Sequence, residues 1–393
     1  MSRKRPNTII GPPAEGAKYL ERSKLQAELL EAIRNGEHVI LTAPRRVGKS
    51  SVMIALASQE HPDLVLIYEN IESDGSSREF YQRLWGLLVK QLSSQIKASK
   101  QLQQWIKGRT VSGASMDGVE LQKVELDHKA ELLSLVKALG KEPYKVVLML
   151  DEFPEVLMAI RKKEGEEAAL AILHTLREIR HSADFRNFST IIAGSIGLHH
   201  VVSMLGRLTT INDMRTADVP VLTKEEGADL LELMLNGATI QLDKVARTHL
   251  LETVGYLLPY HMQLVVVAID ARSEVKGQEI VTPELIDEAA NMVVSWSDKF
   301  EDWELRLNDY LPKADHEYCL AVLTRCAHGE MYTIQQAFDL SKVVVPERSY
   351  MALIQDVLCR DGYLYQEGNR LLFLAPFVRR WWVIRHPEHE IND

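Results

Sequence analysis

The sequence predicts an α/β protein in which a parallel sheet is followed by a helical lid domain and then by a C-terminal winged-helix domain. Up to residue 220, short apolar runs alternate with helical patterns, as they do in parallel sheets. Residues 221–300 carry helical patterns alone, and residues 301–393 combine helical patterns with a hairpin-like segment. We therefore expect three domains, covering residues 1–220 (with an N-terminal arm), 221–300 and 301–393.

The composition predicts a cytoplasmic protein. The chain has 393 residues, of which 46% are hydrophobic, and no apolar run is long enough to span a membrane. The first seven residues are basic, but no apolar signal segment follows them. The cysteines, at positions 319, 326 and 359, have neither disulfide nor metal-ligand spacing. A net charge of −9 argues against a protein that is basic overall and binds nucleic acid with its whole surface.

The first landmark is Ala43–Ser50, which reads A-P-R-R-V-G-K-S. An apolar run, 39–41, precedes it and a helical pattern follows it, which is the order of a P-loop with alanine at the first glycine position. In a P-loop, backbone N–H groups and the helix N-terminus surround a phosphate. Lys49 would then reach the β- and γ-phosphates, and the Ser50 hydroxyl would bind Mg²⁺. The alternative is a chance G-K-S in a turn.

The nucleotide-binding residues expected in this segment are Ala43, Pro44, Arg45, Arg46, Val47, Gly48, Lys49, Ser50 and Ser51. We interpret the two arginines as residues that shape the loop or face a partner, because Lys49 already serves the phosphates. Around the segment we expect an arm at 1–17, helices at 19–35, 79–97 and 128–139, a strand at 64–71 and a mobile polar loop at 108–118.

The second landmark is Tyr144–Glu152. Its five consecutive apolar residues, Val146 to Leu150, are typical of a central parallel strand buried on both faces. The strand ends in Asp151 and Glu152, the Walker B arrangement. Asp151 would hold Mg²⁺ through water, and Glu152 would orient and polarise an attacking water. The alternative is an Asp-Glu pair that only starts a helix.

Another short strand is expected at Ser189–Ser195, after a helix at Ala168–His181. Ser195 follows the apolar part of this strand. In nucleotide switches this position can contact the γ-phosphate or the attacking water, so we include Ser195 among the nucleotide-binding residues. The alternative is a serine that caps a helix or makes a turn.

Beyond residue 221 the sequence predicts helices as far as Phe300. Thr223 and Glu226 have the spacing of a capping box. Gly255 would end one helix and Pro259 would open the next, which on its own indicates only a corner between two helices.

The last ninety or so residues have a different pattern. Helices are expected at 315–326 and 350–361, followed by a β-hairpin at 362–374 that turns at Gly368-Asn369. Helices followed by a two-stranded wing suggest a winged helix. Residues 376–382 would form an aromatic helix packed against this domain.

With these elements placed, the chain resembles the prokaryotic AAA+/STAND-type ATPases, often described as archaeal-type ATPases. The resemblance covers nearly the whole chain. It depends on A-P-R-R-V-G-K-S-S at 43–51, D-E-F at 151–153, I-I-A-G-S at 191–195, G-Y-L-L-P-Y at 255–260 and the terminal winged helix.

The resemblance implies that the chain binds ATP and Mg²⁺ and hydrolyses ATP slowly, moving its lid and winged helix with the nucleotide state. It also implies that Arg22 lies near the nucleotide, and that Pro259, supported by Tyr260, packs near the adenine or ribose. The chain departs from the family pattern at Ala43, which replaces a glycine, and at Gly255, which is not followed by a second glycine.

Several functions stay open at this point. The first is an ATP-dependent switch or assembly ATPase that acts on a protein partner or a homo-oligomer. The second is a DNA-binding, origin-recognition-like or transposition-type loader. Residues 314–393 contain 8 Lys+Arg and 11 Asp+Glu, whereas a surface that follows phosphates should be basic. The third is a nucleotide-binding scaffold without turnover. Glu152 argues against this function, because a protein that only binds nucleotide needs no carboxylate to activate water. If the active form is a multimer, Arg207 or Arg215 would act on the neighbouring subunit's nucleotide.

Overall fold

The computed structural model describes residues 3–94, 98–111, 126–194, 197–329, 331–345 and 347–387. The chain forms two compact units. The first, here called the sheet unit, consists of Ser23–Leu41 and Met53–Ala217. The second, here called the pocket unit, consists of Met1–Arg22, Thr42–Val52 and Asp218–Asp393. The P-loop segment therefore belongs mainly to the pocket unit and the Walker B strand to the sheet unit. The three domain boundaries expected from the sequence stay a prediction.

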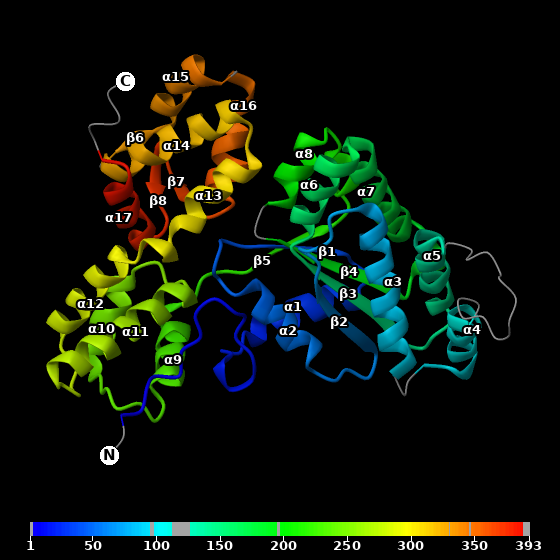
Figure 1. Cartoon of the computed structure of the whole chain (residues 1–393), viewed down its shortest axis with the longest axis horizontal. Coiled ribbons are helices and arrows are strands. Elements are labelled where there is room, and N and C mark those ends of the chain that lie inside the picture. The colour runs from blue at the N-terminus through cyan, green and yellow to red at the C-terminus, as the bar shows by residue number, and fades with distance from the viewer. Residues whose placement is uncertain are drawn as a thin grey trace, which may run out of the picture. The chain divides into compact units, whose positions relative to one another are not determined.

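The sheet has five strands in the order β2-β3-β4-β1-β5 (Figure 1). Their bounds are β1 Val39–Thr42, β2 Leu64–Asn70, β3 Lys145–Asp151, β4 Phe188–Ala193 and β5 Arg215–Asp218. β4 pairs in parallel with both β1 and β3, and β2 pairs in parallel with β3. Val146 to Leu150, in the middle of β3, are completely or almost completely buried. The predicted parallel α/β sheet is confirmed.

Helices connect these strands. They are α1 Ser23–Arg34, α2 Lys49–Ala57, α3 Ser77–Ser94, α4 Lys100–Val111, α5 His128–Leu139, α6 Phe153–Glu164, α7 Glu166–His181 and α8 Leu198–Met204. Short 3₁₀ turns lie at Ala183–Phe185 and Leu208–Thr210. α3 packs against α5 and α7, and α6 packs against α7, α8 and β4.

Two expectations in this region need correction or fall outside the structure. The polar loop expected from Gly108 is wrong at its start, because α4 continues through Gly108 to Val111. A single glycine costs a helix only about 1 kcal/mol relative to alanine, which neighbouring turns can offset. Residues 112–118 of that loop and residues 95–97 of the expected helix lie outside the described residues.

The pocket unit begins with the arm, residues 3–22, which contains a 3₁₀ turn at Gly16–Lys18. Its first group of helices comprises α9 Lys224–Leu235, α10 Lys244–Val254, α11 Pro259–Lys276 and α12 Pro283–Ser295. Thr223 and Glu226 form the predicted capping box at the start of α9. Gly255, with φ of 66°, ends α10, and Pro259 is at the first turn of α11. Both helix boundaries predicted from these residues are confirmed.

The C-terminal part of the pocket unit combines helices with a small sheet of order β6-β8-β7 (Figure 1). Its elements are α13 Glu301–Tyr310, α14 Lys313–His328, β6 Tyr332–Thr333, α15 Ile334–Val344, α16 Glu347–Ala352, a π-helix at Leu353–Cys359, β7 Leu364–Glu367, β8 Arg370–Phe373 and α17 Pro376–Arg385. The predicted hairpin is present, with antiparallel β7 and β8 joined at Gly368-Asn369. Trp381 and Trp382 of α17 are buried, as expected.

Among the described residues, no helix has the length and apolar character needed to cross a bilayer.

Candidate functional site

The P-loop connects β1 to α2, which begins at Lys49. Gly48 has a φ of 99°, and Arg46 has a φ of 65°. In the part of the chain that the structure describes, Arg46 and Glu152 are the two non-glycine residues with a positive φ. A left-handed backbone at a residue other than glycine costs about 1–3 kcal/mol of strain, and such residues cluster at functional sites. Backbone strain is therefore concentrated at the two segments that the sequence singled out.

The Lys49 side chain is buried within the loop itself. Its Nζ donates a hydrogen bond to the carbonyl oxygen of Ala43, 3.2 Å away. The ammonium group thus bridges the first and seventh residues of the P-loop. A cation held at the centre of a loop followed by a helix N-terminus favours an anion there, because the ammonium and the helix dipole act in the same direction.

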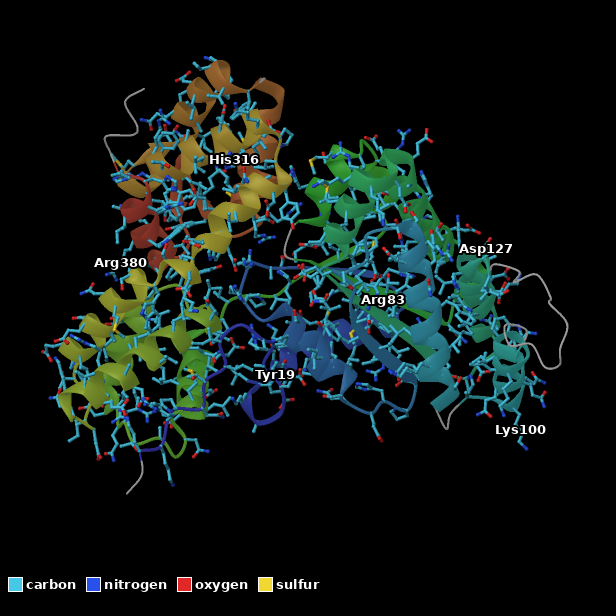
Figure 2. The ribbon with its side chains drawn as sticks, viewed as in Figure 1. Tyr19, Arg83, Lys100, Asp127, His316 and Arg380 are labelled. Atoms are coloured by element: carbon cyan, nitrogen blue, oxygen red, sulfur yellow. The ribbon has the colours of Figure 1, made fainter. Side chains whose placement is uncertain are left out.

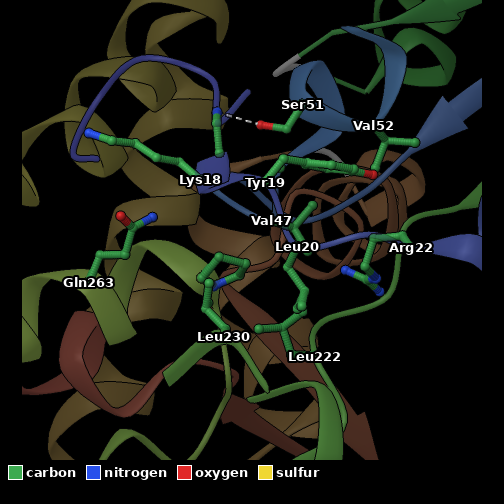
Figure 3. A pocket seen from close by; sticks show the side chains of 13 residues that line it. Lys18, Tyr19, Leu20, Arg22, Val47, Ser51, Val52, Leu222, Leu230 and Gln263 are labelled. Atoms are coloured by element: carbon green, nitrogen blue, oxygen red, sulfur yellow. Dashed lines mark hydrogen bonds between the residues drawn. The ribbon is translucent and has the colours of Figure 1, made fainter. Parts of the chain in front are cut away.

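The arm is attached to the beginning of α2. The backbone N–H of Ala14 donates to the Ser51 hydroxyl oxygen at 2.8 Å, as the dashed line in Figure 3 shows. This bond uses an acceptor of Ser51, one position after the serine expected to bind Mg²⁺. Ser51 therefore connects the arm to the P-loop helix.

A pocket opens between the arm, the P-loop and the first helices after the sheet, all within the pocket unit (Figure 3). It is lined by Ala14, Lys18, Tyr19, Leu20, Arg22, Val47, Gly48, Ser51, Val52, Leu222, Leu230, Pro259 and Gln263. Most of these side chains are apolar, with a few polar groups among them, which is the usual composition of a small-molecule site. Burial raises the pKa of Tyr19 to about 12, so its hydroxyl stays neutral at physiological pH.

Arg22 is 6% exposed and occupies one wall of this pocket. Its Nε lies 3.1 Å from Glu226 Oε1, and its Nη2 donates to the Pro220 carbonyl at 2.9 Å. Glu226 is also the capping-box residue of α9. One carboxylate therefore fixes both the arginine and the start of the helix. The structure brings Arg22 and Pro259, both predicted from the family resemblance, to the same pocket as Gly48.

The first residues of the arm are held to the helices that follow the sheet. Asp270, on α11, accepts hydrogen bonds from Arg3 at 2.7 Å and from Arg5 at 2.7 Å. The Ile9 N–H donates to the side-chain oxygen of Gln263, another α11 residue that lines the pocket. We call these contacts the arm strap. The positive charges of Arg3 and Arg5 are therefore paired with a carboxylate of the same protein.

The two P-loop arginines point to the C-terminal part of the pocket unit. Nη2 of Arg45 and Nη2 of Arg46 lie 2.9 and 2.6 Å from the same oxygen, Oδ2 of Asp302. The Arg46 guanidinium also lies over the ring of Tyr260, 4.6 Å from its centroid. Burial raises the pKa of Tyr260, and the positive charge of Arg46 opposes this effect. These contacts agree with a loop-shaping role for both arginines.

The Walker B residues lie in the sheet unit. Asp151 is 1% exposed at the end of β3. Its Oδ2 accepts a hydrogen bond from the Tyr68 hydroxyl at 3.0 Å, and its Oδ1 accepts one from the Glu152 N–H at 3.2 Å. Glu152 has a left-handed backbone, with φ of 60°. The Asp151 carboxylate is thus oriented from two sides, and the chain turns sharply immediately after it.

Gly194 directly follows β4 and packs against the start of α6. A Cβ at this position would lie 2.4 Å from Cδ of Pro154 and 2.9 Å from Oε2 of Glu155. No side chain fits there, so the glycine allows the chain that follows β4 to pass close to α6, the helix that begins after Asp151 and Glu152. Ser195, the next residue, lies outside the described residues, and its expected contact with the γ-phosphate stays a prediction.

The arginines considered for a neighbouring subunit's site differ in their surroundings. Arg215, on β5, forms a 3.0 Å ion pair with Glu37. Arg207 precedes the 3₁₀ turn at Leu208–Thr210 and is exposed. Arg215 is also exposed, but it would have to break its ion pair with Glu37 before it could reach a neighbour.

Sequence reasoning missed Tyr68, Gln263 and Asp302. A signal existed for Tyr68, since β2 and β3 are parallel neighbours and Tyr68 pairs with Met149, which faces the same side of the sheet as Asp151. The contacts of Gln263 and Asp302 join segments more than 250 residues apart in sequence, and no local pattern announces them.

Comparisons with known proteins agree on the fold. Residues 33–202 match the family model described as an AAA domain. A Walker-type ATPase of Pyrococcus abyssi superposes with a TM-score of 0.63 and 16% identity, over 95% of this chain and 99% of that one. The ORC2 protein of Aeropyrum pernix, in ADPNP–ADP complexes, gives a TM-score of 0.54 and 15% identity, over 96% and 95%. No curated protein matches the chain in sequence. Residues 33–202 are therefore similar to an AAA domain, and the chain has the P-loop NTPase fold.

Proposed function

We propose that the protein is an AAA+/STAND-like ATPase that binds ATP with Mg²⁺, hydrolyses it slowly and uses the nucleotide state to act on a partner. The observation that carries this proposal is the pocket itself. It joins Val47, Gly48 and Ser51 of the P-loop segment to Arg22 and Pro259, so one hollow combines part of a phosphate-binding loop with an apolar wall. A nucleoside triphosphate has the complementary parts: a charged phosphate chain and a flat apolar base.

In this proposal the phosphates bind at the P-loop. The N–H groups from Arg45 to Ser50 and the N-terminus of α2 supply donors and positive potential. Lys49 exchanges its bond with the Ala43 carbonyl for the β- and γ-phosphates. Ala43 contributes this carbonyl, and Pro44 limits the flexibility of the loop entrance.

The base and ribose occupy the apolar part of the pocket. Leu20, Leu222 and Leu230 supply apolar surface, and Pro259 supplies a rigid edge. Arg22, held by Glu226, stands beside them with its charge compensated. The arm closes one side of the site, which couples its attachment to nucleotide affinity.

Hydrolysis requires the Walker B carboxylates beside the phosphates. β1 and β3 are both parallel neighbours of β4, so their carboxyl ends leave the same edge of the sheet. Mg²⁺ would be held by the Ser50 hydroxyl and, through water, by Asp151, both of which offer the oxygen ligands that this ion prefers. The ion would neutralise phosphate charge. Tyr68 keeps the Asp151 carboxylate in place, and Glu152 orients and polarises the attacking water.

Slow turnover and partner dependence belong to the same proposal. In phosphoryl transfer, an arginine supplied by a neighbour or a partner accelerates the reaction by about 10³–10⁵. Arg207 is the better placed of the two arginines for this role, because Arg215 would first have to break its ion pair with Glu37. We propose that the C-terminal helices and the β7–β8 hairpin form a winged helix that contacts a protein partner or a second copy of the chain.

A DNA-binding loader is the second candidate, favoured by the fold similarity to the ORC2 protein. Charge speaks against it. Two arginines near the C-terminus already have partners within the protein: Arg385 pairs with Glu304, and Arg380 (Figure 2) donates to the side-chain oxygen of Asn291. Together with the acid excess after residue 313, these contacts leave the region a poor match for a phosphate backbone.

Steady-state ATP hydrolysis, measured with and without duplex DNA over a range of protein concentrations and at two salt levels, separates these functions. We expect a slow, Mg²⁺-dependent rate that DNA does not change. Salt-sensitive stimulation by DNA would favour the loader. A rate per protein that rises with concentration would indicate a site completed by a second copy, and the Arg207→Ala variant should then lose the increase.

A further inference from the structure

Asp302, at the start of α13, binds both P-loop arginines through a single carboxylate. Arg45 and Arg46 converge on its Oδ2, and Arg45 Nη1 also donates to the Asp302 backbone carbonyl at 3.3 Å. Both guanidinium groups are mostly buried, with 19% and 24% of the side chains exposed, while Asp302 is 40% exposed. The contact therefore lies at the rim of the unit, where the carboxylate can be reached.

Two further contacts hold the same part of the loop. Tyr260 lies under the Arg46 guanidinium, a cation–π arrangement. Gly362, in the turn before β7, approaches Pro44 so closely that a Cβ on it would lie 2.6 Å from the Pro44 Cβ. The P-loop is thus fixed from outside by α11, by α13 and by the turn before β7.

Among the residues that contact the P-loop from outside, Asp302 is the one that balances the charge of the two arginines. Two cations share one anion, and the positive charge of Arg306 also acts on Arg45. If Asp302 moved away, Arg45 and Arg46 would repel each other across a short distance. Arg46 would also lose the ion pair that accompanies its left-handed backbone, with φ of 65°. The conformation of the P-loop therefore depends on where α13 lies.

We infer that Asp302 is a positioning residue that couples the C-terminal helices to nucleotide retention. Paired with Arg45 and Arg46, it keeps the P-loop in its phosphate-binding shape and slows nucleotide release. A partner that binds the C-terminal helices and draws α13 away breaks these two ion pairs and speeds nucleotide exchange. By linkage, bound nucleotide opposes that movement to the same extent. This inference rests on the proposed nucleotide site and adds its regulation.

The test compares three full-length variants with the wild type. Asp302→Asn removes the charge at nearly constant shape, and Asp302→Glu restores a carboxylate. Asp298→Asn is the matched control, since Asp298 lies four residues earlier, is exposed and pairs with Lys299 rather than with the P-loop. The first readout is the dissociation rate of a fluorescent ADP analogue. The second, made without nucleotide, is hydrogen exchange in peptides covering residues 43–53.

For Asp302→Asn we expect dissociation to accelerate about fivefold to fiftyfold, within the usual range of coupling between sites. Exchange in residues 43–53 should rise in the same variant. Asp302→Glu and Asp298→Asn should stay within about twofold of the wild type for both readouts, since each leaves a carboxylate at position 302.

The possible failures are distinguishable. If the wild type does not bind the ADP analogue, the proposed function fails, while the exchange measurement still tests the P-loop contact. If the wild type binds and Asp302→Asn matches it in dissociation and exchange, the inference is wrong and the proposed function stands. Slower dissociation in Asp302→Asn would also contradict the inference.

Discussion

Replacing Asp270 with Asn should release the arm from the helices that follow the sheet. Asp270 is buried, with 5% of its side chain exposed, and Arg3, with 20% exposed, donates to it through Nε at 3.2 Å and Nη2 at 2.7 Å. Arg5 also donates to Asp270, but its side chain is 58% exposed and solvent screens the pair. The loss of stabilisation should therefore come mainly from Arg3.

The magnitude follows from these contacts. A hydrogen bond to a charged group contributes about 1.5–3 kcal/mol, and Asn keeps the acceptor oxygen but loses the charge. We take the loss as about 1.5–2.5 kcal/mol, which corresponds to a roughly 13-fold to 70-fold larger population of released arm. Since Ala14, Lys18 and Tyr19 of the arm line the pocket, nucleotide affinity should also fall.

Hydrogen exchange measures the release directly. The Asn7 amide donates to the Met234 carbonyl at 2.7 Å, so its protection reports the strap. Glu274→Gln is the control, because Glu274, on the same helix, pairs with the exposed Arg5 and not with Arg3 in the part of the chain that the structure describes. Faster exchange at Asn7 in Asp270→Asn, with little change in Glu274→Gln, is the expected result. Equal protection of Asn7 in Asp270→Asn and the wild type would mean that Asp270 does not hold the arm.

Two further predictions concern stability. Gly362→Ala should lower the free energy of unfolding in urea more than Gly368→Ala. Both glycines have a positive φ, so either alanine costs about 1–2 kcal/mol of backbone strain. Of the two, the alanine at 362 also places a Cβ against Pro44, which costs about 1–3 kcal/mol more. Equal losses of stability in the two variants would mean that Pro44 moves aside without cost, which would contradict the prediction. Burial lowers the pKa of His38 to about 3, and its Nδ1 accepts the Thr190 N–H, so the folded protein requires the neutral ring. The pKa of the His38 ring in the unfolded chain is about 6.5, so the stability that the neutral ring provides is fully present above pH 6.5 and is lost as pH falls towards 3. The fall in Tm between pH 6.5 and 3 should therefore be shallower in His38→Gln than in the wild type. An equal slope of Tm against pH in the two proteins would contradict this prediction.

Local sequence patterns predicted the elements that depend on local physics. The apolar run Val146–Leu150 became the buried centre of β3, and Thr223 with Glu226 formed a capping box. β5 was missed because its four residues, Arg-Thr-Ala-Asp, are largely exposed and carry no alternation. It joins the sheet by pairing with its neighbour at the edge, a long-range event.

The same distinction holds for the candidate site. Lys49, Ser50, Asp151 and Glu152 are predicted from short motifs whose spacing is set by the chemistry of phosphate and Mg²⁺. The Asp302 contacts and the arm strap join residues more than 250 positions apart. Such ion pairs depend on which surfaces meet after folding, and a single sequence gives no period or spacing that announces them.

In the proposed function, the protein binds ATP at the P-loop and hydrolyses it with Glu152. The most direct measurement is ATP binding and turnover side by side in the wild type, Glu152→Gln and Lys49→Ala. We predict that Glu152→Gln binds ATP as the wild type does but loses turnover by about 10²-fold or more, and that Lys49→Ala loses binding as well. Undiminished turnover in Glu152→Gln, or unaltered binding in Lys49→Ala, would contradict the account.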